Sequence, residues 1–194
     1  MSAAPSWLLA LHSSTAELGV GLRHLEGGMP DRIATFPLGR ALSNQLLSCV
    51  EQVLPAAQWP ELGRLAVATG PGGFTGTRLT VVMARTLAQQ LLLPLDGVGS
   101  FLLVARRLGL AEPTWLVQEL PRRGLVAGLY GPEAPSAGAA VVELQTPRLH
   151  ADPSALAAIH PAPQRPAAVA VAADVAELLA LAQQAHQRGQ PAPW

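Results

Sequence analysis

The chain has 194 residues, of which 49% are hydrophobic and 13% charged, so it can bury a core and is not disordered in general. Its basic and acidic residues balance at 13 each, whereas a protein that binds RNA mainly through phosphates would have a basic surface. A single cysteine, no basic segment before an apolar core at the N-terminus, and apolar runs well short of the ~20 residues that span a bilayer predict a cytoplasmic protein without disulfide, signal peptide or membrane span.

The first hundred residues alternate between predicted strands and helices. Apolar runs predict strands at 7–11, 18–23 and 32–36, and their close succession favours an antiparallel meander. A helix is predicted over roughly 40–54, because apolar residues recur there at helical spacing and Pro55 follows. The recurring residues are Leu42, Leu46, Cys49, Val50 and Val53.

A strand at 65–69 then leads through a glycine-rich turn into a second predicted helix over roughly 76–92, which Pro94 ends. Leu79, Val82, Met83 and Leu87 mark the predicted core face of this helix. The order of elements is strand-strand-strand-helix-strand-helix-strand.

The second half of the chain has a weaker pattern. Strands are predicted at 114–118, 124–130 and 139–144, and five prolines between 147 and 166 predict an irregular connection. A further strand is predicted at 167–172, and Asp174 is expected to cap a last helix. We therefore expect an N-terminal lobe at 1–108 and a shortened C-terminal lobe at 109–194, whose final helix packs back on the first lobe.

The glycine-rich turn is the clearest candidate functional segment. Its glycines permit positive φ angles and a sharp turn, and Pro71 favours an extended Gly70. Thr75 or Thr77 is expected to cap the following helix, whose free N–H groups could bind an anion, although a tight strand-to-helix connection explains the pattern equally well. The chain has no lysine, which excludes a P-loop. The candidate residues of the turn are Gly70, Pro71, Gly72, Gly73, Phe74, Thr75, Gly76 and Arg78.

Residues 70–78 resemble the G-P-G-S-F-T-G-x-R signature of the TsaB (YeaZ) family, with Gly73 in place of serine. Residues 7–15 resemble the family's L-x-I-D-T-S-T opening, and residues 95–101 resemble its P-x-x-G-V-S-S/T-L segment. The resemblance implies an α/β fold of the actin-like ATPase (ASKHA, ribonuclease H-like) class, in which a mixed sheet has flanking helices and the second of two lobes is abbreviated. The predicted order of elements agrees with one lobe of that fold.

The resemblance also implies a function. The family is the dimerisation subunit of the bacterial system that makes threonylcarbamoyladenosine in tRNA, so we expect a non-catalytic scaffold that supports a TsaD-like catalytic subunit. A TsaE-like ATPase is a further expected partner, and a homodimer is expected when the chain is alone. Direct tRNA binding, membrane binding and a cofactor of the isolated chain are not expected, and a nucleotide is expected only at a partner interface.

The two predicted helices are the expected interface, because the second is apolar around more than one stripe, and such a helix is either buried or has a partner. Burial within the chain remains the alternative. The candidate interface residues are Leu42, Leu46, Val50, Val81, Ala84, Arg85 and Ala88.

Chemistry by the chain alone has little support in the sequence. The first turn has His12 where the family has aspartate, and adjacent strand residues point to opposite faces, so His12 is badly placed to activate Ser13. The five histidines show no metal-binding spacing, and none of the four aspartates stands where an actin-like ATPase would hold Mg²⁺. We therefore predict no catalytic and no metal-binding residue.

Two alternatives stay open. One is a self-sufficient nucleotide-binding phosphotransferase that uses the glycine turn. The other is a degenerate homodimeric paralogue, because residues 120–127 lack the acids of the family's D-A-R-x-G-E-V-Y segment and Leu42 replaces a histidine of its first helix. The family's C-terminal P-x-Y-L-R tail is also replaced, by residues 191–194.

Overall fold

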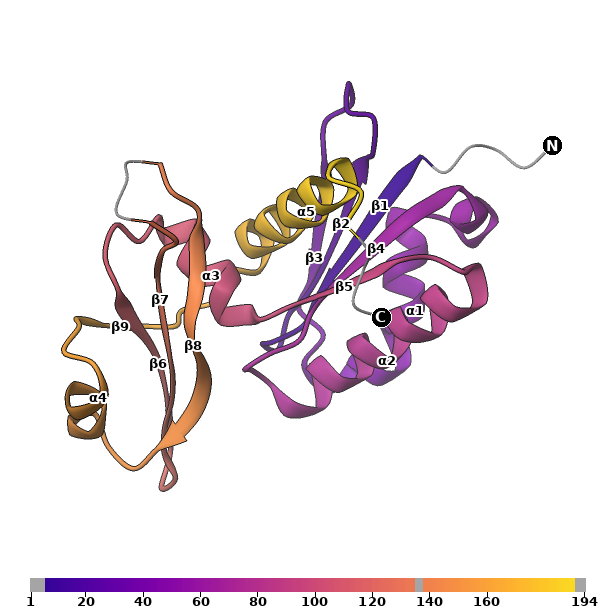
Figure 1. Ribbon diagram of the computed structural model, residues 1–194. Helices are drawn as coiled ribbons and strands as arrows, with labels where there is room; N and C mark the ends of the chain where they lie inside the picture. The colour runs from indigo at the N-terminus through magenta and orange to yellow at the C-terminus, as the bar shows by residue number, and fades with distance from the viewer. Residues whose placement is uncertain (1–5, 135–137, 191–194) are drawn as a thin grey trace. The chain divides into compact units, whose positions relative to one another are not determined.

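The computed structural model describes residues 6–134 and 138–190, so the C-terminal tail at 191–194 lies outside it. The chain forms two compact units: one runs from the N-terminal end to Ser100 and resumes at Ala170, and the other is Phe101–Val169 (Figure 1). This division differs from the predicted one at residue 108, because the segment after Ser100 already belongs to the second unit. Within the described ranges, no helix combines the length and the apolar character needed to cross a membrane.

The first unit is built on a five-stranded sheet of order β3-β2-β1-β4-β5. β1 (Trp7–His12), β2 (Leu18–His24) and β3 (Arg32–Phe36) form the predicted antiparallel meander, which is confirmed. β4 (Leu62–Ala68) runs parallel to β1, and β5 (Leu95–Val98) runs parallel to β4.

Helices cover both faces of this sheet, with α1 (Leu42–Val53) and α2 (Phe74–Leu91) on one face and α5 (Val171–Gln187) on the other (Figure 1). The predicted bounds of α1 and α2 are confirmed to within two residues. Short 3₁₀ helices at Gly39–Ala41 and Ala56–Glu61 precede α1 and β4.

Large and small residues alternate along β2, and their side chains determine how closely the helices on each face approach the sheet. The leucines and valine of β2 join the hydrophobic cluster beneath α1 and α2. Gly19 and Gly21 point to the opposite face, where a Cβ would lie 2.5 Å from Cγ1 of Val171 and 2.4 Å from Cγ1 of Val175. Glycine at both positions therefore lets α5 lie directly on the sheet.

The second unit has a four-stranded sheet of order β8-β7-β6-β9. β6 (Thr114–Leu120), β7 (Gly124–Pro132) and β8 (Val141–His150) are antiparallel, and the short β9 (Gln164–Pro166) runs parallel to β6. α3 (Ser100–Leu108) packs on this sheet through Phe101 and Val104, and α4 (Ser154–Ile159) packs through Leu156 on a separate cluster around Trp115.

Three predictions about this half are wrong in detail. The strand expected at 167–172 does not form, because the short β9 ends at Pro166 and α5 begins at Val171, and the helix α3 was not expected at all. β8 continues through Pro147, which an edge strand tolerates. Asp174 lies inside α5 rather than before it, and its carboxylate accepts the N–H of the N-cap residue Ala170 at 2.9 Å.

Candidate functional site

The glycine-rich turn, residues 70–78 and hereafter the signature loop, packs on the turn that follows β1. A Cβ at Gly72 would lie 2.4 Å from Cβ and 2.5 Å from the carbonyl oxygen of Ser14, and a Cβ at Gly76 would lie 3.0 Å from the carbonyl oxygen of Ser13. The Gly73 N–H donates to the Ser14 carbonyl at 2.6 Å. The glycines therefore permit contact between two backbone segments, a use of glycine that a sequence pattern alone does not distinguish from a phosphate cradle.

The start of the signature loop corrects one expectation. Gly70 has φ +93, so it is not extended, and β4 has already ended at Ala68. The Ser100 N–H donates to the Gly70 carbonyl at 2.7 Å, and the Gly70 N–H donates to the Ser100 hydroxyl at 3.1 Å. Both backbone polar groups of Gly70 are thus bonded to Ser100.

Buried hydroxyl groups join the three segments that carry the family resemblance. The Ser14 and Ser100 hydroxyls lie 2.5 Å apart, and so do the Ser13 and Thr80 hydroxyls. Thr80 also donates to the Gly76 carbonyl at 3.1 Å. Both serines of the first turn thus have structural partners, and Ser13 is bonded to Thr80 rather than to His12.

His12 lies buried on the α5 face of the sheet. Its Nδ1 accepts the Ser14 N–H at 3.4 Å, and its Nε2 is buried without a hydrogen-bond partner among the described residues. Burial lowers the pKa of His12 from 6.5 to about 4, and the nearby negative charge of Asp174 opposes that shift only in part. The imidazole is therefore neutral near pH 7.

Each of the four aspartates has a structural partner. Asp96 holds Arg64 through two hydrogen bonds of 2.6 and 2.9 Å, and Asp31 holds Arg23 through bonds of 2.8 and 2.6 Å. Asp152 accepts hydrogen bonds at the start of α4, which lower the pKa of its exposed carboxyl. Asp174 accepts the N–H of Ala170, the N-cap residue of α5. The described His, Cys, Asp and Glu side chains form no group of three that could hold a metal ion.

The structure corrects the predicted face of α2. Ala84 and Ala88 are buried in the core of the first unit with Leu87, whereas Val82, which was assigned to the core, is 62% exposed. Small side chains pack where the helix lies close to the sheet, so alanine rather than valine faces inward. Of the other candidate interface residues, Arg85 is exposed and Val81 is half-buried, and the three on α1 are buried in the same core: Leu42, Leu46 and Val50.

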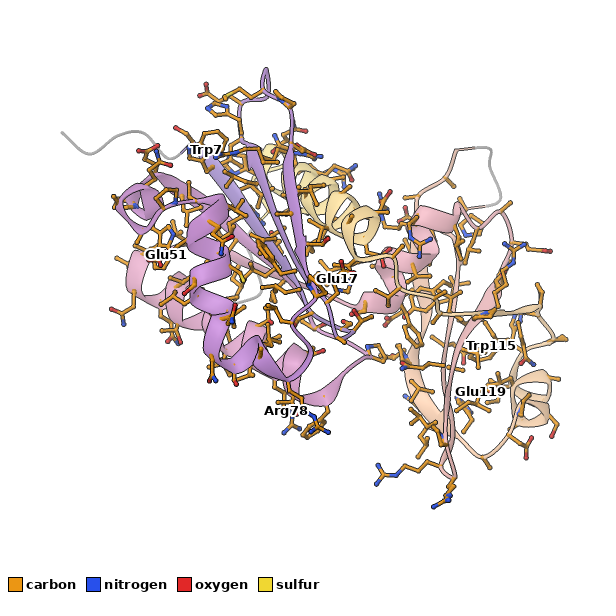
Figure 2. All side chains as sticks on the ribbon, turned by 180° about the vertical axis from the view of Figure 1, so that it is seen from behind. Trp7, Glu17, Glu51, Arg78, Trp115 and Glu119 are labelled. Carbon is orange, nitrogen blue, oxygen red and sulfur yellow. The ribbon has the colours of Figure 1, made fainter. Side chains whose placement is uncertain are left out.

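Two residues of the signature loop, Phe74 and Arg78, form an exposed stack. The guanidinium of Arg78 lies 3.6 Å from the centre of the Phe74 ring, and the Phe74 side chain is 68% exposed. Figure 2 shows Arg78 projecting outward from the first unit. Aromatic residues and arginine are enriched in protein–protein interfaces relative to the rest of a protein surface.

The start of α2 also differs from the expectation. The helix begins at Phe74 with Gly73 as N-cap and without a side-chain cap, so neither threonine caps it. Thr75 is exposed, and the Thr77 hydroxyl is buried without a partner among the described atoms. Because the Gly73 N–H is bonded to Ser14, it is not free for a phosphate.

Serine at position 73 is expected to raise the free energy of unfolding by about 0.5 kcal/mol, because a serine N-cap accepts a helical N–H and reduces the freedom of the unfolded chain. The position has space, since the nearest atom to a Cβ there is the Ser14 carbonyl oxygen at 3.5 Å. Urea unfolding of Gly73→Ser and Gly73→Ala followed by circular dichroism measures the difference. A serine variant no more stable than the alanine variant would contradict the capping role.

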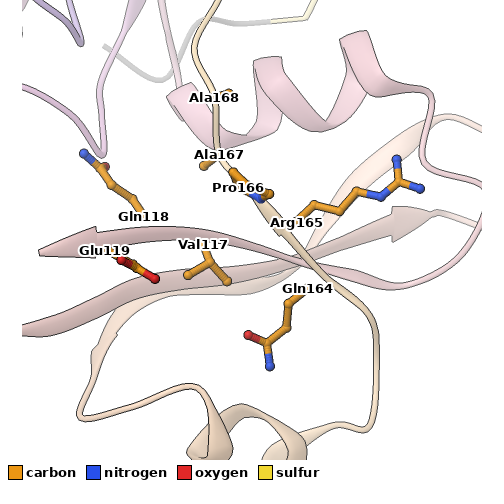
Figure 3. Close-up of a pocket in the computed structure, with 8 residues that line it drawn as sticks. All are labelled: Val117, Gln118, Glu119, Gln164, Arg165, Pro166, Ala167 and Ala168. Atoms are coloured by element: carbon orange, nitrogen blue, oxygen red, sulfur yellow. The ribbon is translucent and has the colours of Figure 1, made fainter.

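A groove of about 460 Å³ lies between β6 and β9 in the second unit. Figure 3 shows its polar side chains pointing in different directions: Gln118 and Arg165 extend to opposite sides, and Gln164 points away from both. A small-molecule site needs polar groups that converge, so this groove is a weak candidate.

The chain is similar to a family profile, to a curated relative and to solved structures. The profile of the family described as TsaD, tRNA N6-adenosine threonylcarbamoyltransferase, matches residues 36–122. The tRNA threonylcarbamoyladenosine biosynthesis protein TsaB of Bacillus subtilis is 30% identical over 95 residues, which span 48% of this chain and 41% of that protein. The match thus covers about two fifths of the length of the curated relative.

Two solved structures from Pseudomonas aeruginosa are similar over almost the whole chain. YeaZ has 24% identity and a TM-score of 0.70, with 96% of both chains covered. A protein described as similar to the peptidase YeaZ has 25% identity and a TM-score of 0.69, with 96% of this chain and 94% of that one covered.

The mixed five-stranded sheet with its antiparallel meander, and the glycine loop packed on the first turn, define an actin-like ATPase (ribonuclease H-like) fold. Within that class the chain is similar to the TsaB/YeaZ family: the TsaB relative matches about half of the chain, and the two Pseudomonas aeruginosa structures share its fold over 96% of the chain.

Proposed function

We propose that this chain is a cytoplasmic, non-catalytic dimerisation subunit that supports a TsaD-like catalytic subunit in threonylcarbamoyl transfer to adenosine of tRNA. It is not an enzyme by itself, it needs no cofactor of its own, and it does not contact tRNA directly. A TsaE-like ATPase is a further partner, and a homodimer forms when the chain is alone. A nucleotide binds, if at all, only at a partner interface.

The observation that carries this proposal is a set of exposed side chains on α1 and α2, hereafter the helix surface: Leu47 of α1, and Phe74, Arg78 and Val82, which are four residues apart along one face of α2. Leu47 is 51% exposed and Val82 is 62% exposed, although both helices bury their other faces against the sheet. Isolated exposed leucines need no explanation, but apolar residues on two neighbouring helices beside an aromatic–arginine stack fit a partner.

The buried polar groups support the non-catalytic part of the proposal. A phosphotransferase would need carboxylates free to hold Mg²⁺ near the glycine loop, and the aspartates bind other groups of the chain instead. The hydroxyls of the first turn are likewise bonded to Thr80 and Ser100.

Glutamate at both Leu47 and Val82 is expected to abolish co-purification with the TsaD-like protein of the same organism, a loss of at least about 100-fold in affinity. Both side chains are exposed, so folding should persist, whereas the fully buried Ala84 would not tolerate glutamate. Co-expression, affinity purification and mass measurement give the stoichiometry. The matched control is Met29→Glu, which changes a 55% exposed side chain on the β2–β3 hairpin.

Each outcome of this experiment has a distinct meaning. A double variant that co-purifies at the yield of the unmodified chain would place the interface elsewhere. An unmodified chain that forms only a homodimer, leaving the TsaD-like protein behind, would indicate a paralogue outside the pathway. Tight binding of ATP and Mg²⁺ by the isolated chain in calorimetry would instead favour a nucleotide-dependent enzyme.

A further inference from the structure

Polar side chains gather on one face of the second sheet, where its edge strand β8 meets a hydrophobic cluster. Leu125, Ala127 and Leu129 of β7 are buried on the α4 side of the sheet in the cluster around Trp115. The antiparallel register pairs these three with residues of β8, and paired residues share a face. The three β8 residues on the α4 side are therefore His150, Arg148 and Gln145.

The helix α4 has only six residues and leaves part of this face open. It packs on the cluster through Leu156, and the indole N–H of Trp115 donates to the His160 carbonyl at 3.0 Å. Trp115 thus lies in the second unit with its indole held by the segment after α4 (Figure 2). Beside it is a cavity of about 540 Å³, lined by Trp115, Ile159 and five residues of β8.

The charged residue in the lining of this cavity is an arginine. Arg148 lines it together with His150, and no carboxylate does. Arg148 has no hydrogen-bond or ion-pair partner among the described residues, although its guanidinium is always charged. Two acids that are close to these residues in sequence have other partners: Glu143 accepts a hydrogen bond from the Tyr130 hydroxyl, and Asp152 accepts the Ser154 N–H at the start of α4. The cavity therefore favours a negatively charged ligand.

The remaining lining is apolar or hydrogen-bonding. Leu144 and Ile159 are 42% and 50% exposed, and the His150 ring stands edge-on to Trp115 with 6.0 Å between the ring centres. Gln145 and Thr146 add an amide and a hydroxyl. Unlike the groove of Figure 3, this cavity combines one cationic side, apolar surface and polar groups that share a face.

We propose that the α4-side cavity of the second sheet binds a small organic anion, a carboxylate or phosphate carried on an apolar or aromatic body. Arg148 binds the oxyanion with its planar guanidinium, while Leu144 and Ile159 contact the body. The volume lies within the roughly 300–1,000 Å³ typical of small-molecule sites. An RNA backbone is the less favoured ligand, because such binding needs a series of cations along a groove and this lining contains one arginine.

The test uses the full chain and four probes: 1-naphthyl phosphate, 1-naphthoate, the neutral 1-naphthylmethanol and inorganic phosphate. Calorimetry, with ligand-observed NMR for weak binders, is expected to show that at least one aromatic anion binds. The neutral probe and inorganic phosphate are expected to bind at least about tenfold more weakly than that anion. The two aromatic anions tell carboxylate from phosphate selectivity.

Arg148→Gln is expected to weaken binding of the preferred anion by about tenfold to 100-fold, because it removes a charge-assisted hydrogen bond. Both Arg148 and the control residue Arg165 are exposed, and Arg165 lines the other groove, so Arg165→Gln should change the affinity less than about twofold. Unchanged circular dichroism of both variants verifies folding.

Three results would overturn the proposal: no binding of either aromatic anion at about 5 mM, equal binding by Arg148→Gln, or a short single-stranded RNA that binds more tightly than both anions and loses affinity in Arg148→Gln. The proposal is independent of the scaffold function. Arg148→Gln should still co-purify with the TsaD-like protein, so the two proposals can fail separately.

Discussion

Alanine at Gly72 is expected to lower the free energy of unfolding by about 3 kcal/mol, since overpacking against backbone atoms cannot be relieved by a rotamer change. The new Cβ would lie 2.5 Å from the Ser14 carbonyl oxygen and 2.7 Å from its Cα, so the signature loop would have to move off the first turn. Chemical unfolding in urea, followed by far-ultraviolet circular dichroism, measures the change.

Gly73→Ala is the matched control for this change. Gly73 is the next residue and has a φ of −57, and a Cβ there would make only ordinary contacts, so its stability should stay within about 0.5 kcal/mol of the unmodified chain. Equal urea midpoints for the two variants would show that the loop is not packed on Ser14. Displacement of the loop should also weaken partner binding, because α2 and its exposed Phe74 begin two residues later.

The sequence predicts the first unit better than the second, and for a physical reason. The meander and the helices α1 and α2 are long, periodic segments bounded by Pro55 and Pro94, so local patterns define them. The three-residue strand β9 has no pattern of its own and forms only because β6 offers a partner. The helix α3 (Ser100–Leu108) was not predicted, because no secondary structure was assigned to residues 100–108 from the sequence.

The site shows a similar limit. The signature loop was found, but its packing partner was not, because Ser14, Thr80 and Ser100 are distant in sequence and become neighbours only in the fold. The face of α2 was misassigned because hydropathy favours valine over alanine as a core residue. Close approach to the sheet selects by size instead, so Ala84 is buried and Val82 is exposed.

Acidification is expected to destabilise the chain through His12, because burial lowers the pKa of this imidazole in the folded chain. The unfolded chain takes up this proton near pH 6.5, whereas the buried imidazole does so only near pH 4. Between these values the unfolded state binds more protons, so the free energy of unfolding falls by about 1.4 kcal/mol per pH unit as the pH decreases. The contribution is complete above pH 6.5, and about 3 kcal/mol of it is lost by pH 4.

Urea unfolding at several pH values between 7 and 4 tests this expectation, with His12→Asn as the variant that cannot titrate. Asparagine retains an acceptor for the Ser14 N–H, so the variant should keep its fold while its stability varies less with pH. Asparagine at the exposed His186 is the control and should leave the slope unchanged. If His12→Asn lost stability with acid as steeply as the unmodified chain, the acid sensitivity would come from other groups. A flatter curve in His12→Asn alone would show that the histidine standing in place of the family's aspartate is held neutral beneath α5, and that this first turn carries no charge for catalysis.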